Sequence, residues 1–112
     1  MKKIEAIIRT SRFYEVKDAL HEVGVDFFSY TDVKGVGNQK REAVYRGTVY
    51  DMGAIARTKL EIIISENLEK VVSAILEAGK TGDLGDGKIF VYDCESVTKI
   101  RTGETGVDAL RS

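Results

Sequence analysis

The chain of 112 residues repeats one pattern of apolar residues twice. The stretch Ile4-Glu5-Ala6-Ile7-Ile8 corresponds to Leu60-Glu61-Ile62-Ile63-Ile64, with position 4 matching position 60, an offset of 56 residues. Both stretches are apolar runs of the length of a β-strand. Each run is followed by apolar residues at helical spacing and then by a second apolar run. The chain is therefore predicted to form a strand, a helix and a strand, twice over.

The two predicted helices are located by their apolar stripes. The stripes consist of Phe13, Val16, Ala19, Leu20 and Val23 in the first half, and of Leu68, Val71, Val72, Ile75 and Leu76 in the second. Ser11 is predicted to be the N-cap of the first helix, and Ser65 or Asn67 the N-cap of the second. Gly24 and Gly79 are predicted to end the two helices at their C′ positions.

The returning strands are predicted from Val25 to about Val36 and from Lys88 to about Cys94. Two such units predict an α+β, ferredoxin-like domain, a double βαβ with a four-stranded antiparallel sheet and two helices on one face. The other face of the sheet would remain uncovered although it is partly apolar. We therefore expect a homo-oligomer that buries it.

Two segments extend this plan within a single domain over residues 1–112. The connection from Gly37 to about Ala56 has no clean apolar period and is rich in glycine, charge and tyrosine. A connection of this length in a small domain is predicted to be a mobile interaction loop. The C-terminal segment, about 95–112, is predicted to hold a short strand near Val97 to Arg101 and then a polar tail.

Composition excludes several classes of protein. The formal net charge of −1 argues against broad electrostatic binding to nucleic acid or to a membrane surface. No apolar run approaches the roughly 20 residues of a membrane span, and the charged, short apolar start is predicted to be a strand, not a signal peptide. The single Cys94 fits a reducing cytoplasm and is predicted to be a buried thiol. His21, the only histidine, is expected to be exposed and unable to activate a nucleophile.

A glycine-rich turn and a basic doublet point to a phosphate ligand. The stretch Thr81–Phe90 places three glycines and Lys88 in a turn that leads into an apolar strand. Glycines let consecutive backbone N–H groups converge on an anion. Lys99 and Arg101 are two residues apart, so on an extended segment they point to the same face. Together these groups supply donors and cations that suit a polyphosphate.

Four stretches of the chain, in order, resemble signatures of the PII nitrogen-regulatory signal-transduction family. They are Val33–Lys40, Tyr45–Gly47, Thr81–Val91 and Ile100–Glu104. The resemblance covers essentially the whole chain, and the glycine-rich turn followed by Arg-Thr-Gly-Glu is its most specific part. It implies a homotrimer with three nucleotide sites in the clefts between subunits, which bind ATP or ADP competitively, and Mg-ATP together with 2-oxoglutarate.

The resemblance also implies which residues meet the phosphates. Gly85, Gly87 and Lys88 resemble the phosphate turn, and Lys99 and Arg101 resemble the basic pair that reaches the phosphates from a neighbouring subunit. The alternatives are a plain tight turn with a solvated lysine, and an edge strand guarded by charge.

Further nucleotide contacts are implied at the base of the loop and on the sheet. Gly35 and Gly37 resemble the backbone approach to the nucleotide, whereas Asn38 replaces an arginine that many bacterial members carry. Loss of that charge would weaken ATP relative to ADP. Ile7 and Ser29 lie where the family cups adenine, although Ile7 also fits ordinary core packing.

The positions implied for Mg²⁺ and 2-oxoglutarate depart from the family pattern. Gln39 resembles the side chain that helps to hold both ligands. Arg57 aligns with a lysine that binds the dicarboxylate, at the end of a loop one residue shorter than is common. An arginine can grip a carboxylate with two bonds. Arg9, followed by Thr10-Ser11, replaces the usual Lys-Pro pair.

The long loop is where the resemblance implies contact with target proteins. Arg46, beside Gly47, resembles a tip arginine that enters an ammonium transporter, with a solvated loop charge as the alternative. Tyr50 lies at a tyrosine that some bacterial members have nucleotidylated, with an unmodified contact residue as the alternative. The predicted function is a cytoplasmic, non-enzymatic regulator of a transporter or a nitrogen-metabolism enzyme, which meets a membrane only through such a partner.

Two other functions are weighed beside this one. A slow ATPase would use the same nucleotide site, with Asp86 as the nearby carboxylate for activating water. A ferredoxin-like RNA-binding module would need exposed aromatic residues on the two central strands, and Phe90 and Tyr92 alternate with the core pattern. The acidic pI of about 5.9 speaks against the RNA-binding module.

Overall fold

The main structure is one four-stranded sheet, and in its two central strands buried and less buried residues alternate. The computed structural model of the protein describes residues 1–36, 42–45, 48–51 and 55–111. The repeated apolar runs form β1 (Lys2–Arg9) and β5 (Arg57–Ile64), which pair antiparallel with Ile4 opposite Ile62. β2 (Ser29–Val33) pairs with β5, and β6 (Lys88–Asp93) pairs with β1. The strand order is β2-β5-β1-β6, and every pairing is antiparallel.

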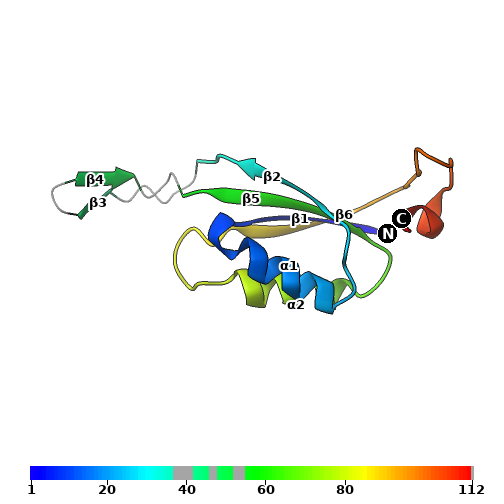
Figure 1. Cartoon of the computed structure of the whole chain (residues 1–112), viewed down its shortest axis with the longest axis horizontal. Helices are drawn as coiled ribbons and strands as arrows, with labels where there is room; N and C mark the ends of the chain where they lie inside the picture. The colour runs from blue at the N-terminus through cyan, green and yellow to red at the C-terminus, as the bar shows by residue number, and fades with distance from the viewer. Residues whose placement is uncertain (37–41, 46–47, 52–54, 112) are drawn as a thin grey trace.

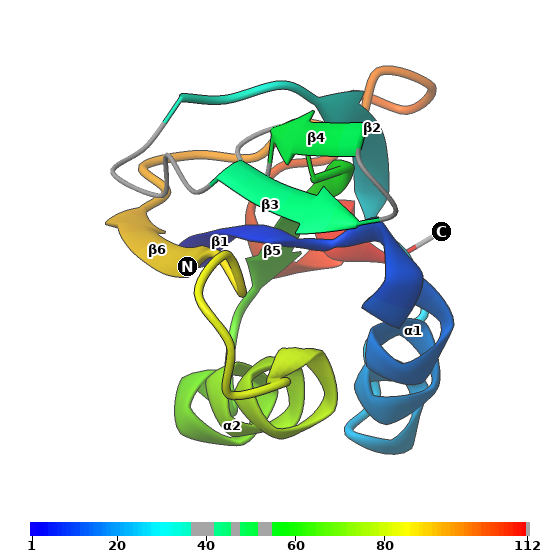
Figure 2. The same ribbon diagram turned by 90° about the vertical axis from the view of Figure 1, so that its left-hand side faces the viewer.

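Both helices lie on one face of this sheet. α1 (Phe13–Glu22) and α2 (Leu68–Gly79) run side by side beneath it (Figures 1 and 2). The core is formed by alternate strand residues and by one stripe from each helix. Its members are Ile4, Ala6, Ile8, Val16, Leu20, Leu60, Ile62, Ile64, Val71 and Ile75. The predicted α+β, ferredoxin-like fold is confirmed.

The ends of the helices follow the predictions only in part. Gly24 follows the C-cap Val23 with φ +87°, as expected of a C′ glycine. Asn67 stands at the N-cap position of α2, but its side chain makes no capping hydrogen bond. The prediction for Ser11 is wrong, because the chain forms a 3-10 turn over Thr10–Arg12 before α1 begins.

Two predictions on α2 are also wrong. Gly79 is the buried last residue of the helix, not a C′ stop. A Cβ there would lie 3.6 Å from methyl groups of Ile8 and Val16, an ordinary van der Waals contact, so this position packs against β1 and α1. Leu76 is 54% exposed. The predicted stripe is wider than the surface that the sheet and α1 cover, and Leu76 lies on its uncovered flank.

The returning strands are shorter than predicted. β2 begins at Ser29, because the amide of Val25 still closes the end of α1 by donating to Leu20 O, 2.9 Å away. β6 ends at Asp93, one residue before the predicted boundary. Cys94 is partly exposed, with its thiol 3.4 Å from Ser96 O, so the prediction of a buried thiol is wrong.

The long connection contains a second, two-stranded sheet. β3 (Glu42–Tyr45) and β4 (Thr48–Asp51) pair antiparallel, with Val44 opposite Val49. They lie beyond the end of the main sheet from which the connection leaves (Figure 1). A hairpin was not expected from the sequence, because its strands are short and have no apolar period.

The C-terminal segment forms turns, and the predicted strand near 97–101 is wrong. Thr98 and Thr105 form an isolated bridge, and a 3-10 helix covers Gly106–Leu110. The chain reverses direction at Gly103, whose φ of +75° favours glycine. No helix in the described part of the chain has the length and apolar character needed to cross a membrane.

Candidate functional site

The glycine-rich turn connects α2 to β6 and is pressed against the end of the sheet. Gly85 and Gly87 have φ values of +101° and +94°. A Cβ on Gly87 would lie 1.7 Å from Ile7 O, and a Cβ on Gly85 would lie 2.9 Å from an Arg57 nitrogen. Both positions favour glycine for their backbone angles, and at position 87 the backbone of β1 also leaves no space for a Cβ. The turn is built into the sheet, unlike a plain surface turn.

The side chain of Asp86 organises the turn from within. Its carboxylate accepts hydrogen bonds from the hydroxyl of Thr81, the amides of Thr81 and Gly82 at 2.9 Å each, and Arg9 Nε at 2.9 Å. The Thr81 hydroxyl, Arg9 and these amides hold the pKa of the Asp86 carboxyl well below its usual range. An anion bound by four donors is a poor general base. The geometry thus gives Asp86 a structural role and does not support the water-activating role weighed above.

Two arginines from neighbouring strands grip the carbonyls of the turn. Arg9 ends β1 and Arg57 begins β5, and they are register partners. Arg9 Nη2 donates to Leu84 O at 2.7 Å, and Arg57 Nε donates to Gly85 O at 3.2 Å. The side chain of Arg57, implied as a carboxylate ligand, therefore lies directly beside the glycine-rich turn.

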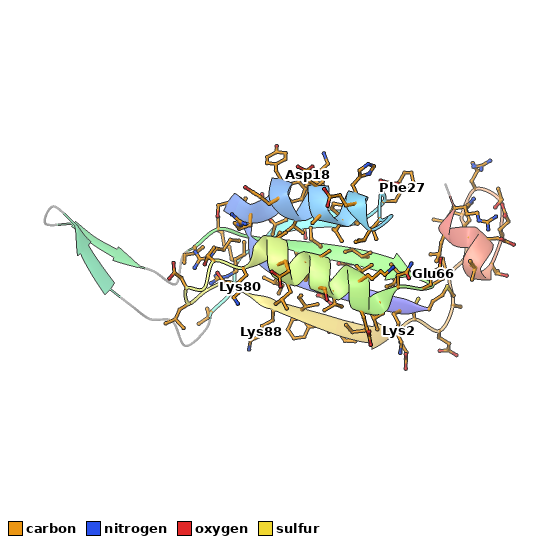
Figure 3. The ribbon with its side chains drawn as sticks, turned by 90° about the horizontal axis from the view of Figure 1, so that it is seen from below. Lys2, Asp18, Phe27, Glu66, Lys80 and Lys88 are labelled. Atoms are coloured by element: carbon orange, nitrogen blue, oxygen red, sulfur yellow. The ribbon has the colours of Figure 1, made fainter. Side chains whose placement is uncertain are left out.

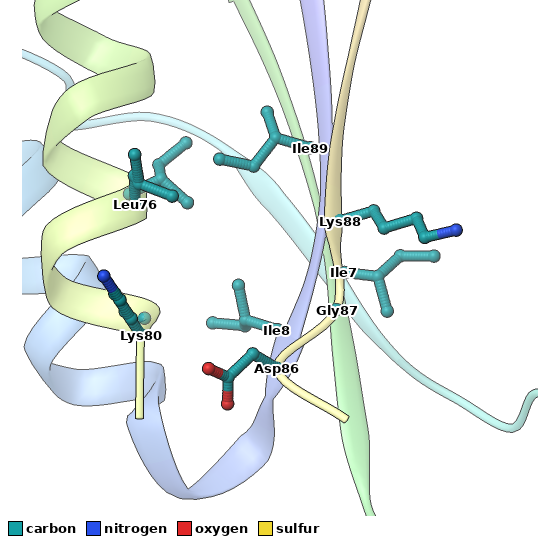
Figure 4. Close-up of a pocket in the computed structure, with 10 residues that line it drawn as sticks. Ile7, Ile8, Leu76, Lys80, Asp86, Gly87, Lys88 and Ile89 are labelled. Atoms are coloured by element: carbon teal, nitrogen blue, oxygen red, sulfur yellow. The ribbon is translucent and has the colours of Figure 1, made fainter. Parts of the chain in front are cut away.

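The side chains beside the turn differ between the helix-free face of the sheet and the face that the helices cover. Lys88 and Ile7 are register partners, and Figure 4 shows both side chains directed away from the helices. On the helix side, a hollow of about 330 Å³ between α2 and β6 is lined in part by Ile8, Leu76 and Ile89. Ile7 lies on the helix-free face, outside the core cluster, so the alternative of core packing does not hold for it. A cation and an apolar side chain thus stand together beside the glycine turn.

Some of the predicted site residues do not meet within one chain. Gly35 comes two residues after Val33, the last residue of β2. Val33 pairs with Arg57, which bonds to the glycine turn, so Gly35 follows a strand end that lies near the turn. Ser29 is at the other end of β2. The segment after β6, which contains Lys99 and Arg101, lies beyond the opposite end of the sheet from the glycine turn (Figure 1).

The local geometry of the basic doublet also differs from the prediction. Lys99 and Arg101 belong to a turn closed by the Gly103 amide, which donates to Lys99 O at 2.8 Å. The prediction that they share one face of an extended segment is therefore wrong. Lys99 pairs with Glu104 at 3.8 Å, whereas Arg101 is exposed.

Several predicted residues lie outside the described part of the chain. These are Gly37, Asn38, Gln39, Arg46 and Gly47. Tyr50 belongs to β4, but its side chain is not described. Among the residues that are described, no group of three or more His, Cys, Asp or Glu side chains is arranged to hold a metal ion.

The helix-free face of the sheet does not resemble an RNA platform. Phe90 and Tyr92, 40% and 48% exposed, lie on the edge strand β6, whereas an RNA-binding module stacks bases on its central strands. The central strands instead carry ion pairs, with Lys59 3.7 Å from Glu5 and 3.3 Å from Glu61. His21 is exposed, as predicted, and pairs with Asp26.

Sequence reasoning missed the residues that hold the turn together. Asp86 was considered only as a base, and Arg9 only as a departure from a family pattern. The closeness of Thr81 to Asp86 is a local signal, because short polar side chains commonly bond to backbone amides in turns. Arg9 gives no such signal, since it is 77 residues away from Asp86 in sequence.

Comparison with known proteins identifies relatives over nearly the whole chain. The sequence model described as "Nitrogen regulatory protein P-II" matches residues 1–104. The nitrogen regulatory protein P-II of Rhizobium meliloti (strain 1021) is 49% identical over 98% of this chain and 100% of its own length. Nitrogen regulatory protein P-II 1 of Methanothermobacter thermautotrophicus is 50% identical over 98% of this chain and 97% of its own. A crystal structure of the PII protein of Arabidopsis thaliana bound to citrate superposes with a TM-score of 0.78 at 35% identity, covering 96% of this chain and 90% of that one.

Proposed function

The chain belongs to the nitrogen regulatory P-II protein family, and from this premise we propose that it is a non-enzymatic regulator that binds ATP and ADP at the glycine turn. The observation that carries the proposal is the turn itself. Its glycines at positions 85 and 87 have positive φ angles, the second with no space for a Cβ, its carbonyls are held by two arginines, and Lys88 stands at its rim. Such a turn presents amides and positive charge to phosphate groups.

The proposed site is completed by a second copy of the chain. The segment that carries Lys99 and Arg101 leaves the opposite end of the sheet from the turn, so within one protomer the pair does not reach the turn's ligand (Figure 1). A neighbouring protomer in a homotrimer would bring its own pair to this turn. The helix-free face of the sheet, with Phe90 and Tyr92 partly exposed, is the surface we propose to be covered in that trimer.

We propose Mg²⁺ and 2-oxoglutarate as further ligands, with Gln39 and Arg57 as their protein contacts. Support for the dicarboxylate comes from Arg57, whose guanidinium lies beside Gly85 where a ligand next to the nucleotide would be. The Arabidopsis relative was solved with citrate, which is also a carboxylate. Bound together, the ligands would favour one arrangement of the loop that follows Gly35.

The proposed output is regulation of a target protein through the loop between β2 and β5. The target would be an ammonium transporter or an enzyme of nitrogen metabolism, with Arg46, Gly47 and Tyr50 at the contact. Hydrolysis of the nucleotide is not part of the proposal, because Asp86 is held by four donors and is a poor general base.

Isothermal titration of the purified protein with ATP and ADP, each with and without Mg²⁺ and 2-oxoglutarate, tests this function. ATP binding that strengthens when 2-oxoglutarate is present would support a sensor of both ligands. Nucleotide binding that ignores 2-oxoglutarate would leave a sensor of adenylates alone and would remove Arg57 from the ligand set. Failure of both nucleotides to bind would overturn the proposal.

A further inference from the structure

Two consecutive carbonyls of the glycine turn are held on the same side by arginines. Arg9 Nη2 is 2.7 Å from Leu84 O, and Arg57 Nε is 3.2 Å from Gly85 O. In a planar trans peptide the carbonyl and the N–H of the same unit point in opposite directions. The N–H groups paired with these two carbonyls belong to Gly85 and Asp86. Both N–H groups are therefore directed away from the guanidinium groups.

These two amides have the arrangement that an anion site requires. Within the described part of the chain, neither the Gly85 nor the Asp86 amide donates a protein hydrogen bond of ordinary length and angle, and the turn at residues 84–85 brings the Asp86 amide toward Asp83 O. Successive amides that converge in a turn bind phosphate oxygens. Each amide belongs to the same rigid peptide unit as one of the two held carbonyls. The arginines that hold the carbonyls therefore also set the direction of the amides.

Arg9 makes two of the bonds that fix this part of the turn. Its side chain is 16% exposed and makes two bonds, to the Leu84 carbonyl and to the Asp86 carboxylate, whose own bonds reach Thr81 and Gly82. A guanidinium can hold both acceptors at once because its N–H donors form a rigid fork. An ammonium on a single stem has no such fork.

We propose that Arg9 is a positioning residue of the phosphate site: by holding the Leu84 carbonyl and the Asp86 carboxylate, it directs the turn amides toward the ligand before any nucleotide binds. This inference rests on the proposed nucleotide binding and adds to it a residue whose bonds are to the turn itself.

Arg12 provides a matched control on the same side of the molecule. It lies three residues further along, and its Nε donates to Ala78 O at 2.9 Å. This bond also joins the start of the chain to the region before the glycine turn, but it ends on α2. Replacing Arg12 therefore removes a comparable arginine–carbonyl bond and leaves the turn carbonyls held.

The test compares ATP and ADP affinities of the full-length chain by isothermal titration, with the thermal midpoint of each ligand-free variant measured alongside. Arg9→Gln is expected to weaken both nucleotides about tenfold, the loss of roughly one hydrogen bond to a charged group. Arg9→Lys should recover part of that loss. Arg12→Gln should lower the thermal midpoint to a similar degree while binding stays within about twofold.

A double-mutant cycle tests whether Arg9 affects nucleotide binding through its bond to Asp86 or through a general loss of stability. Asp86→Asn and Arg9→Gln act on the same bond, so the double variant should bind nucleotide about as weakly as the weaker single variant. Losses that multiply would contradict the proposal, as would an Arg9→Gln protein within about twofold of wild type or an equal loss in Arg12→Gln. If Arg9→Gln does not fold, Arg9→Lys against Arg12→Lys carries the same comparison. If the wild-type protein binds neither nucleotide, the proposed function itself is overturned. If the wild-type protein binds and the Arg9 variants bind equally well, only the role of Arg9 is overturned.

Discussion

The two ends of the central sheet carry the two groups of residues that the sequence assigned to one ligand, and they are built differently. At one end, the glycine turn is held by Asp86, Arg9 and Arg57, and the backbone of β1 leaves no space for a side chain at Gly87. At the other end, the segment after β6 is held by an isolated bridge and a few turn bonds, and Ile100 is fully exposed. Figure 3, seen from the helix side, shows Lys80 and Lys88 at the first end and Lys2 and Glu66 at the second.

In the proposed function, this difference separates a site that one chain folds by itself from a segment that acts on a neighbouring copy. A turn fixed by internal hydrogen bonds is ready to bind, because little ordering remains to be done when the ligand arrives. A basic pair on a loosely held segment gains a fixed position only against another surface. The following predictions test this contrast in order of decreasing effect.

The largest effect is expected for Gly87→Ala. Its Cβ would lie 1.7 Å from a backbone oxygen of β1, so the turn or the strand must move, at a cost above about 4 kcal/mol. Gly103→Ala at the other end has φ +75° but no atom within 4 Å of the new Cβ, and should cost about 1 kcal/mol. Urea unfolding at a fixed protein concentration measures both. Equal losses would show that the glycine turn is not pressed against the sheet.

The next effect is expected for Asp86→Asn, which removes the charge that the four donors of the turn surround. The free energy of unfolding should fall by about 2 kcal/mol at pH 7. Because the folded-state pKa of this carboxyl is lowered, its contribution is present above the ordinary value of 3.8 and is lost as the pH falls through the folded-state value. The variant should therefore lose less stability than wild type below about pH 4.

Asp83→Asn is the matched control for this change, since Asp83 is an exposed aspartate in the same turn. It should leave the urea midpoint unchanged at both pH values. A wild-type and an Asp86→Asn protein with parallel stability curves in acid would contradict the role assigned to Asp86.

A change at the other end should affect binding without affecting folding. The double variant Lys99→Gln/Arg101→Gln should bind ATP about 10- to 100-fold more weakly, since two bonds to a charged ligand are lost. Its free energy of unfolding should stay within about 0.5 kcal/mol of wild type.

Mixing two variants tests whether the basic pair acts on a neighbouring copy. Subunits with Lys88→Gln are refolded together with Lys99→Gln/Arg101→Gln subunits. If the pair acts in a neighbour, some mixed sites combine an intact turn with an intact pair and recover wild-type affinity. If the pair acted within its own chain, no mixed site would recover.

The smallest effect is expected for Ile100→Ala. This side chain is fully exposed, so its removal should change the free energy of unfolding by less than about 0.5 kcal/mol. Ile8→Ala, in the core beneath the glycine turn and 3% exposed, should cost about 3 kcal/mol. Urea unfolding of both variants measures the difference. A large loss for Ile100→Ala would show that this side chain is buried against another copy.

Sequence reasoning was most accurate where a periodic pattern extends over many residues. The strands that begin each half and the helices that follow them lie where the apolar spacing placed them, because one face of each element must be buried. It was least accurate at single positions such as Ser11, Gly79 and Leu76. Their environments depend on how α2 and α1 approach the sheet, and spacing along one segment does not contain that information.

The candidate site shows the same division. The glycines and Lys88 were identified from the sequence, because a turn that converges backbone amides needs glycine wherever φ is positive. The roles of Arg9 and Asp86 were not identified, since their bond joins positions 77 residues apart.

By itself, the sequence determined the double strand–helix–strand plan, the family and the position of the glycine turn, because each of these is recorded in local spacing or in contiguous motifs. Only the tertiary structure decided which residues hold the turn in place and which positively charged side chains lie beside it. β1 and β5 bring Arg9 and Arg57 to the turn, while β6 carries Lys99 and Arg101 to the far end of the sheet. The physical reason is that hydrogen bonds and charges act through space over a few ångströms, and only the packing of the strands sets those distances.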